Sequence, residues 1–458
     1  MALARHIASR EAITGNRERF LLAGFVMAGL AGPAAAAPSA ELIARVSAAV
    51  EADSPRLTAI FKDLHQHPEI AFTEVRTAGI VAAELKTLGF EVTTGIGKTG
   101  VVGVFRNGPG PTLWFRADMD ANSVLEATGL PWASTAPQRL PDGSEIPVMH
   151  ACGHDAHTVW LLGLARAMKT LKADWSGTLV VYAQPAEEVG LGAQAMVKDG
   201  LLTRGFPMPD LALSSHAVPL PVGVAVNAPG VRMAGTDQLD VTFKGVGGHG
   251  STPNLAIDPV VMAAQAVLAY QTVISRSVDP QAPSVLTVGA VEAGRDNNVI
   301  PASAELRLNL RWFDRVVREQ MLKRIDEINR GIVIGAGLPE DKVPVREMKG
   351  SAGPLENDPR LVAAIDPALT VLLGKDGLIK DFPSVMGSED FQEAFASTRT
   401  PYTFLLIGIA DTARFAAAKK AGRPFPFANH NNDFVVELAA IPLGTRINTV
   451  AALALLAK

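Results

Sequence analysis

Nine consecutive residues, Met149 to His157, carry the densest collection of reactive side chains in this 458-residue sequence. They include three histidines, one aspartate and Cys152, the only cysteine in the chain. Thiolate and imidazole groups are ligands of borderline-soft divalent metals. Because Cys152 and His154 are two residues apart, their side chains could meet one ion in an extended loop. The segment therefore predicts a metal site, and the alternative is a buried cysteine with solvated histidines before a helix.

Two adjacent carboxylates, Glu187 and Glu188, follow a predicted apolar strand and the turn Gln184–Ala186. Neighbouring side chains on an extended chain point apart, so one carboxylate could bind a metal while the other faces a bound water. A metal-assisted hydrolase needs this arrangement of Lewis acid and general base. Taken alone, the pair could equally be a solvated acidic start to a helix.

Four further polar residues deserve notice because of where they fall along the chain. Asp118, Asp120 and His216 come at or just after the ends of predicted strands, and His430 lies in an asparagine-rich segment. In parallel sheets, ligands gather at the carboxyl ends of the strands, which favours one site for the first three. Each histidine by itself is more typical of a satisfied core or loop position than of a metal ligand.

The elements that must position these residues alternate between helix and strand. Apolar residues recur at helical spacing from Ala40 to about Lys86, and β-branched strands then alternate with helices, one of them predicted over Thr158–Leu171. Strands separated by crossover helices predict a mostly parallel sheet covered by helices.

From about Ala234 the order changes to strand, helix, two strands and helix, closed by a strand near Val343–Lys349. This order predicts a smaller α+β domain inserted into the α/β domain. We therefore expect residues 38–233 and 350–458 to form the larger domain and residues 234–349 to form the insertion.

Composition excludes several classes of protein. The sequence is 48% hydrophobic and 19% charged, which is typical of a globular protein and not of a disordered chain or a coiled coil. Its formal net charge is −4, and no cluster of lysine and arginine suggests a nucleic-acid partner. No Gly-Xaa-Ser-Xaa-Gly motif occurs, so the usual serine-hydrolase nucleophile signature is missing.

The segment Phe20–Ala37 is the only long apolar run, and it follows Arg17 and Arg19 and ends in small residues. This pattern predicts a signal peptide over residues 1–37, with cleavage near Ala36. We expect a periplasmic or secreted protein that is not inserted in a membrane after processing. The alternative is an uncleaved membrane anchor, for which the run is barely long enough.

Several motifs in this order resemble the M20 metallopeptidases, specifically the amidohydrolase branch that contains hippurate, indole-acetyl amino acid and N-acyl amino acid hydrolases. The resemblance covers nearly the whole chain after residue 37. It is carried by Leu64–Glu69, Arg116–Asp120, Met149–His157, Gln184–Glu188, His216–Pro219, Gly247–Gly250, Asn298–Pro301, Met386–Phe391 and His430.

This resemblance implies a di-metal exopeptidase fold and a role for each motif residue. The two divalent metal ions would be bound by Cys152, His154, Glu188, His216 and His430. Glu187 would be the general base and acid, and Asp118 and Asp120 would orient imidazole ligands. The inserted domain would act as a lid and homodimer contact, with His249 and Asn298 reaching the substrate. Zinc, manganese, cobalt and nickel all suit this donor set.

The expected activity is hydrolysis of the amide bond of N-acyl amino acids by a metal-activated water. A free carboxylate on the amino acid would offer a handle for Arg311 and Asn298, since a guanidinium fork matches a carboxylate. Alternatively, Arg311 pairs with Glu305 or Asp314 on the lid surface. A carboxypeptidase or dipeptidase with the same machinery is the second expectation, and a catalytically silent binding protein is the third. Relatives usually have Ala-Leu-Pro where this chain has Ala121–Ser123, and Leu308–Arg311 also departs from their pattern, which leaves substrate choice open.

Overall fold

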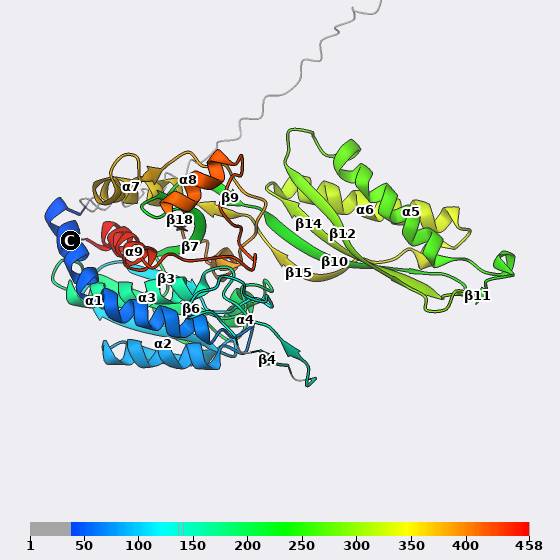
Figure 1. Cartoon of the computed structure of the whole chain (residues 1–458). Coiled ribbons are helices and arrows are strands. Elements are labelled where there is room, and N and C mark those ends of the chain that lie inside the picture. The colour runs from blue at the N-terminus through cyan, green and yellow to red at the C-terminus, as the bar shows by residue number, and fades with distance from the viewer. Residues whose placement is uncertain (1–37, 136, 141, 458) are drawn as a thin grey trace, which may run out of the picture. The chain divides into compact units, whose positions relative to one another are not determined.

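A computed structural model describes residues 38–135, 137–140 and 142–457 (Figure 1). The predicted signal peptide lies outside the described residues. Among the residues that the structure describes, no helix is both long and apolar enough to cross a bilayer.

The larger domain is built on an eight-stranded sheet whose central strands β6, β3, β7 and β18 are parallel neighbours. An antiparallel hairpin, β1 with β2, closes one edge of the sheet. In spatial order the strands are β1 (Glu91–Ile96), β2 (Gly100–Asn107), β6 (Gly177–Gln184), β3 (Thr112–Asp118), β7 (Leu211–Pro221), β18 (Tyr402–Ala410), β8 (Ala225–Val226) and β17 (Leu378–Ile379).

Both faces of this sheet are covered, which explains why its strands read as continuous apolar runs. On one face, Leu113 and Leu179 pack with the main helical core, and on the other Trp114 and Tyr182 pack with Met196 and its neighbours. The helices of this domain are α1 (Ala40–Gln66), α2 (Val75–Thr87), α3 (His154–Thr170), α4 (Gly192–Lys198), α7 (Pro359–Leu373), α8 (Thr412–Lys420) and α9 (Ala440–Leu456).

A second sheet with its own hydrophobic core forms between residues 235 and 352. Its four strands are antiparallel and lie in the order β12 (Ser284–Ala293), β14 (Ser303–Trp312), β10 (Gly235–Lys244) and β15 (Glu347–Ala352). Helices α5 (Pro259–Thr272) and α6 (Arg315–Gly335) pack together on this sheet (Figure 1). The closing strand lies at Glu347–Ala352, so its prediction over Val343–Lys349 was displaced toward the N-terminus.

Small two-stranded sheets complete the fold: β4 (Gln138–Arg139) with β5 (Glu145–Ile146), β9 (Gly230–Met233) with β16 (Leu355–Asn357), and β11 (Gly248–His249) with β13 (Val299–Ile300). The predicted fold class, a helix-covered and mostly parallel sheet with an inserted α+β domain, is confirmed. The limits predicted for the domains remain a prediction.

Candidate metal centre

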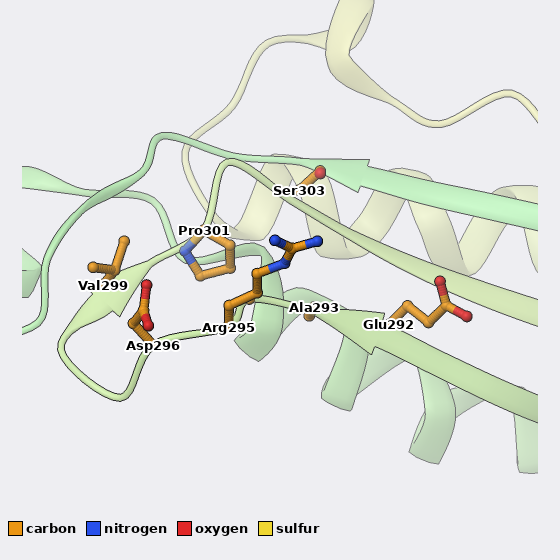
Figure 2. A pocket seen from close by; sticks show the side chains of 8 residues that line it. Glu292, Ala293, Arg295, Asp296, Val299, Pro301 and Ser303 are labelled. Atoms are coloured by element: carbon orange, nitrogen blue, oxygen red, sulfur yellow. The ribbon is translucent and has the colours of Figure 1, made fainter.

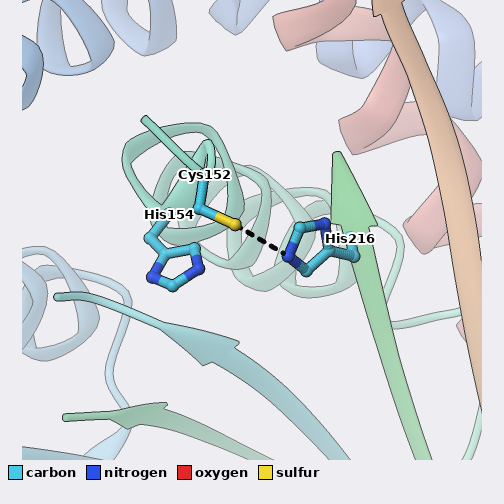
Figure 3. Close-up of side chains that lie close together, drawn as sticks. All are labelled: Cys152, His154 and His216. Carbon is cyan, nitrogen blue, oxygen red and sulfur yellow. Dashed lines mark hydrogen bonds between the residues drawn. The ribbon is translucent and has the colours of Figure 1, made fainter. Parts of the chain in front are cut away.

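Cys152 and His154 are positioned by the sharp start of helix α3. The helix begins at His154 and not at Thr158 as predicted, so the two side chains do not share an extended loop. Gly153 between them has φ 86°, a left-handed conformation that favours glycine. A Cβ on Gly153 would lie 2.8 Å from the Cβ of Ala217. Close packing at Gly153 therefore brings Cys152 against β7, where His216 lies (Figure 3).

Five residues form two groups of potential metal ligands that share one sulfur atom. Donor atoms of Cys152, His154 and His216 lie within 4.8 Å of one another, as do those of Cys152, Glu188 and His430. The Cys152 Sγ atom is 3.5 Å from His216 Nε2 and 3.3 Å from His430 Nε2. A thiolate common to both groups could bridge two ions and offset part of their charge.

Unpartnered polar atoms indicate that this donor set fits divalent metals. His154 Nε2 and Glu188 Oε1 are buried without a hydrogen-bond partner, and they lie 3.6 Å apart. That separation is too long for a hydrogen bond. It is close to the spacing of about 3.4 Å expected for two atoms that each lie about 2.1 Å from one tetrahedral ion.

Hydrogen bonds separate His216, which belongs to the donor cluster, from His157, which lies beside it. His216 donates from Nδ1 to the Ala217 carbonyl oxygen at 2.7 Å, so its Nε2 atom faces Cys152 Sγ and can bind a metal there. His157 instead uses both ring nitrogens: Nδ1 donates to Asp118 at 2.6 Å and Nε2 accepts from the Ala217 amide at 2.7 Å. Burial lowers the pKa of His157 to about 3, consistent with a neutral ring. His157 is therefore a support for β7 and not a ligand, and buried His150 joins neither group.

The electrostatic surroundings favour the ionised forms of the Cys152 thiol and the Glu188 carboxyl group. Burial and Glu188 act to raise the pKa of the Cys152 thiol, but the charge of His216 and its hydrogen bond to Sγ lower it to about 6. Burial also acts to raise the pKa of Glu188, but a hydrogen bond with His430 and the charge of His154 lower it to about 2. Metal binding requires both groups to be deprotonated.

Glu187 and Glu188 follow the end of β6, as predicted, but they lie in a turn and not on the extended chain from which the divergence of their side chains was inferred. Ala186 before them has φ 54°. The Asp120 carboxylate accepts both backbone amides, that of Glu187 at 3.0 Å and that of Glu188 at 2.9 Å. Its Oδ1 is also 3.3 Å from His154 Nδ1. The Asp120 side chain therefore positions both the backbone of the two glutamates and the His154 ring.

The Glu187 carboxylate faces a second acidic cluster. Oxygen atoms of Glu187, Glu389 and Asp390 lie within 4.8 Å of one another. Burial, together with the charges of Glu389, Glu188 and Asp390, raises the pKa of Glu187 well above its usual range. Arg116 balances part of this charge, since its guanidinium lies 2.8 Å from Glu389 and 2.7 Å from Asp118. A carboxyl group that holds a proton readily suits general acid and base chemistry.

Glu74, which was not predicted as a site residue, binds the backbone of the turn that precedes Glu187. This fully buried carboxylate accepts the amides of Ala186 and Phe72, each at 2.9 Å, and the hydroxyl of Thr99. Phe72 and Ala186 both have positive φ, so these hydrogen bonds stabilise two unfavourable backbone conformations. The only sequence signal was its place five residues after the Leu64–Glu69 motif.

We expect Glu74→Ala to lower kcat by about 10- to 100-fold with KM nearly unchanged, because a small displacement of a catalytic group has this effect. Glu74→Gln should restore most of kcat, since its amide oxygen can accept the same backbone amides. Glu69→Ala is the matched control: Glu69 accepts the amides of Arg76 and Thr77 at the start of α2 but does not contact the turn. Steady-state kinetics and thermal melting of all three variants would test this. Equal kcat losses in Glu74→Ala and Glu69→Ala would contradict a specific role for Glu74.

A cavity of about 480 Å³ adjoins the donor cluster. Cys152, Glu187, Glu188, His216 and His430 line it, and Arg311 of β14 also lines it. Arg311 donates to Asn309 at 2.8 Å and to Ser388. Within the described residues Arg311 has no carboxylate partner, and Glu305 pairs with Arg307 instead. The surface pairing considered for Arg311 is therefore not observed.

The other two predicted substrate residues lie together on the inserted domain but do not line this cavity. His249 is in β11, which pairs with β13, and the Gly250 amide donates to the Asn298 carbonyl oxygen at 2.8 Å. A separate hollow of about 370 Å³ lies beside them, lined by Asp296, Val299, Pro301 and their neighbours (Figure 2). The roles of His249 and Asn298 remain predictions.

A helix-covered parallel sheet with this donor cluster beside its central strands is typical of a metal-dependent hydrolase. The model of the peptidase family M20/M25/M40 matches residues 114–420, and the chain belongs to this family. It is a metal-dependent amidohydrolase or peptidase of the M20 type, as the motifs predicted.

Two relatives and one solved structure illustrate the similarity. The chain is 35% identical to hippurate hydrolase of Campylobacter jejuni over 345 residues, 75% of this chain and 85% of the relative. It is 34% identical to N-acetyl-L-cysteine deacetylase of Bacillus subtilis over 355 residues, 77% and 80% of the two chains. The crystal structure of the Bacillus subtilis YXEP protein, described as a dinuclear metal binding peptidase from the M20 family, matches with a TM-score of 0.69 at 27% identity. That match covers 88% of this chain and 99% of the other.

Proposed function

We propose that this protein hydrolyses the amide bond of N-acyl amino acids with two divalent metal ions held by Cys152, His154, Glu188, His216 and His430. The observation that carries the proposal is Arg311, a half-buried guanidinium without an acidic partner among the described residues, in the same cavity as the donor cluster. A guanidinium in this position can bind the carboxylate of an amino acid and orient its amide.

Each polar residue then has a task in the reaction. When bound, the two ions would lower the pKa of a water molecule and polarise the amide oxygen. Glu187 takes a proton at its carboxylate and delivers it to the leaving amine, for which its raised pKa is suited. Asp120 and Glu74 hold the turn that carries Glu187, and Asp118 orients His157 and, through it, β7.

A hydrolysis screen would test the activity. N-acyl amino acids and dipeptides should be offered to one preparation whose metal content is measured, with two ions per chain expected. Preferred cleavage of N-acyl amino acids supports the proposal. Preferred cleavage of dipeptides or of longer peptides from the carboxyl end would replace it with a dipeptidase or carboxypeptidase. No turnover with both metals bound would favour a catalytically silent binding protein.

We further propose that the leader in residues 1–37 directs export to the periplasm or the medium, and that the inserted domain forms a homodimer. Helix α5 supports the dimer because it leaves Val260, Val261 and Leu268 exposed, Leu268 to 74%. Strand β12 supports it as well, since among the described strands this ten-residue edge strand pairs with β14 alone. His249 and Asn298 of the same domain are proposed to reach the substrate, across the dimer or within one chain.

Leu268→Glu should convert the dimer to a monomer, because the substitution places a charge in an apolar contact. Sedimentation velocity at micromolar concentration would measure the change. Val371→Glu is the control, since Val371 is 55% exposed on α7 outside the inserted domain. A monomeric wild type, or a Leu268→Glu variant that stays dimeric, would contradict this contact.

A further inference from the structure

The cavity beside the donor cluster is lined by two chemically different sets of residues. The polar side, as we call the first set, is Thr236, Gln238, Arg311 and Ser388, three of them on strands β10 and β14 of the inserted domain. The second set, which we call the apolar side, belongs to the larger domain. It consists of Val218, Leu220, Met233, Phe382, Val385, Leu406 and Phe425.

Five of these seven apolar residues, all but Met233 and Val385, belong to one small hydrophobic cluster that is separate from the main core. Leu220, Val226 and Ala228 are its buried members. Val218, Phe382, Leu406 and Phe425 pack against them but keep part of their surface exposed. Because these half-buried side chains line the cavity, a ligand there could remove their remaining apolar surface from water.

None of the seven side chains on the apolar side carries a charge. The charged residues that line this cavity are Glu187, Glu188, Arg311, Glu389 and Asp390, which the site already uses. Arg232 lines an adjoining hollow together with Met233, Phe382, Val385 and Leu406, but it does not line this cavity. Its guanidinium donates to the carbonyl oxygens of Val231 and Phe382 and to Ser384. A charged or strongly polar group held against these side chains would lose its hydration without compensation.

We infer that the acyl group of the substrate is uncharged, apolar and much larger than acetyl, of the size of a benzoyl or hexanoyl group, and that Val218, Phe382, Leu406 and Phe425 select it. This inference rests on the proposed function and adds the chemical class of the acyl group. The polar side with Arg311 receives the amino acid and the apolar side receives the acyl chain. An apolar pocket discriminates by more than tenfold for each methylene group that it buries well.

Four derivatives of one amino acid test the inference: N-acetyl, N-hexanoyl, N-benzoyl and N-succinyl, all offered to one metal-replete preparation. The hexanoyl and benzoyl substrates should exceed the acetyl substrate in kcat/KM by about 100-fold or more. The succinyl substrate, which carries a charge at the far end, should fall at least 100-fold below the hexanoyl substrate.

Paired variants assign the preference to this side of the cavity. Phe425→Ala should lower the benzoyl to acetyl ratio of kcat/KM by about tenfold. Phe415→Ala, in the same hydrophobic cluster but away from the cavity, should leave the ratio unchanged. Val218→Thr, which keeps the shape and adds a hydroxyl, gives a second variant that should lower the ratio if Phe425→Ala does not fold. The ratio compares two substrates in one preparation, so a loss of folded protein does not change it.

The outcomes separate this inference from the proposed function. Acetyl turnover equal to or faster than benzoyl turnover overturns the acyl preference and leaves the amidohydrolase assignment standing. The same holds if Phe415→Ala changes the ratio as much as Phe425→Ala does. No hydrolysis of any N-acyl amino acid with both metals bound overturns the proposed function, and the inference with it.

Discussion

Glu187→Gln is expected to lower kcat by at least about 10³-fold while both metal ions stay bound, since general acid–base groups contribute about 10²- to 10⁴-fold. Glutamine keeps the size of the side chain but cannot exchange a proton. The turn should persist, because Asp120 and Glu74 bind its backbone amides and not the Glu187 side chain. Steady-state kinetics and elemental analysis of the same sample provide the measurement.

Glu188→Gln is the matched variant one residue along the same turn. Its Oε1 and Oε2 atoms lie 3.6 Å from His154 Nε2 and 3.3 Å from His430 Nε2, so its charge is expected to bind metal. This variant should lose metal as well as activity, and added metal should restore part of the activity. Near-normal kcat in metal-replete Glu187→Gln would contradict the acid–base role of Glu187. Loss of metal from Glu187→Gln but not from Glu188→Gln would show that Glu187, and not Glu188, binds metal.

The second large effect concerns the carboxylate of the substrate. Amidation of that carboxylate should reduce kcat/KM by about 100-fold or more, because binding energy remote from the reacting amide orients it. Arg311→Ala should cause a loss of the same size for the free acid and little for the amide. Arg311→Lys should recover little of it, since an ammonium group lacks the planar fork of a guanidinium.

Arg307→Ala is the control for this prediction. Arg307 lies four residues before Arg311 on β14, but it is exposed and pairs with Glu292 and Glu305, each at 3.1 Å. Its removal should leave kcat/KM within about twofold of the wild-type value, because exposed ion pairs contribute little. Equal turnover of the free acid and its amide would exclude the carboxylate requirement and make the enzyme a general amidase.

The sequence by itself determined the family and the chemical types of the site residues. Cys152 and His154 stand out because thiolate and imidazole so close together suit metals better than most structural roles. The strands β3 and β6 were readable because a sheet buried on both faces needs continuous apolar runs. Glu187 and Glu188 were found because they follow such a run.

Tertiary structure decided which of these groups meet and how they point. His430 approaches Cys152 across 278 residues, and no local pattern encodes such a contact. The separate roles of His154 and His157 depend on which hydrogen bonds the packed helix and strand leave open, and local spacing does not contain that information. The turn at Ala186 takes a positive φ that its own residue type disfavours, so it is held by Glu74, more than 100 residues away. Arg311 likewise had possible acidic partners nearby in the sequence. Only the folded strand shows that it lines the cavity, because strand register and burial determine which groups a long side chain contacts.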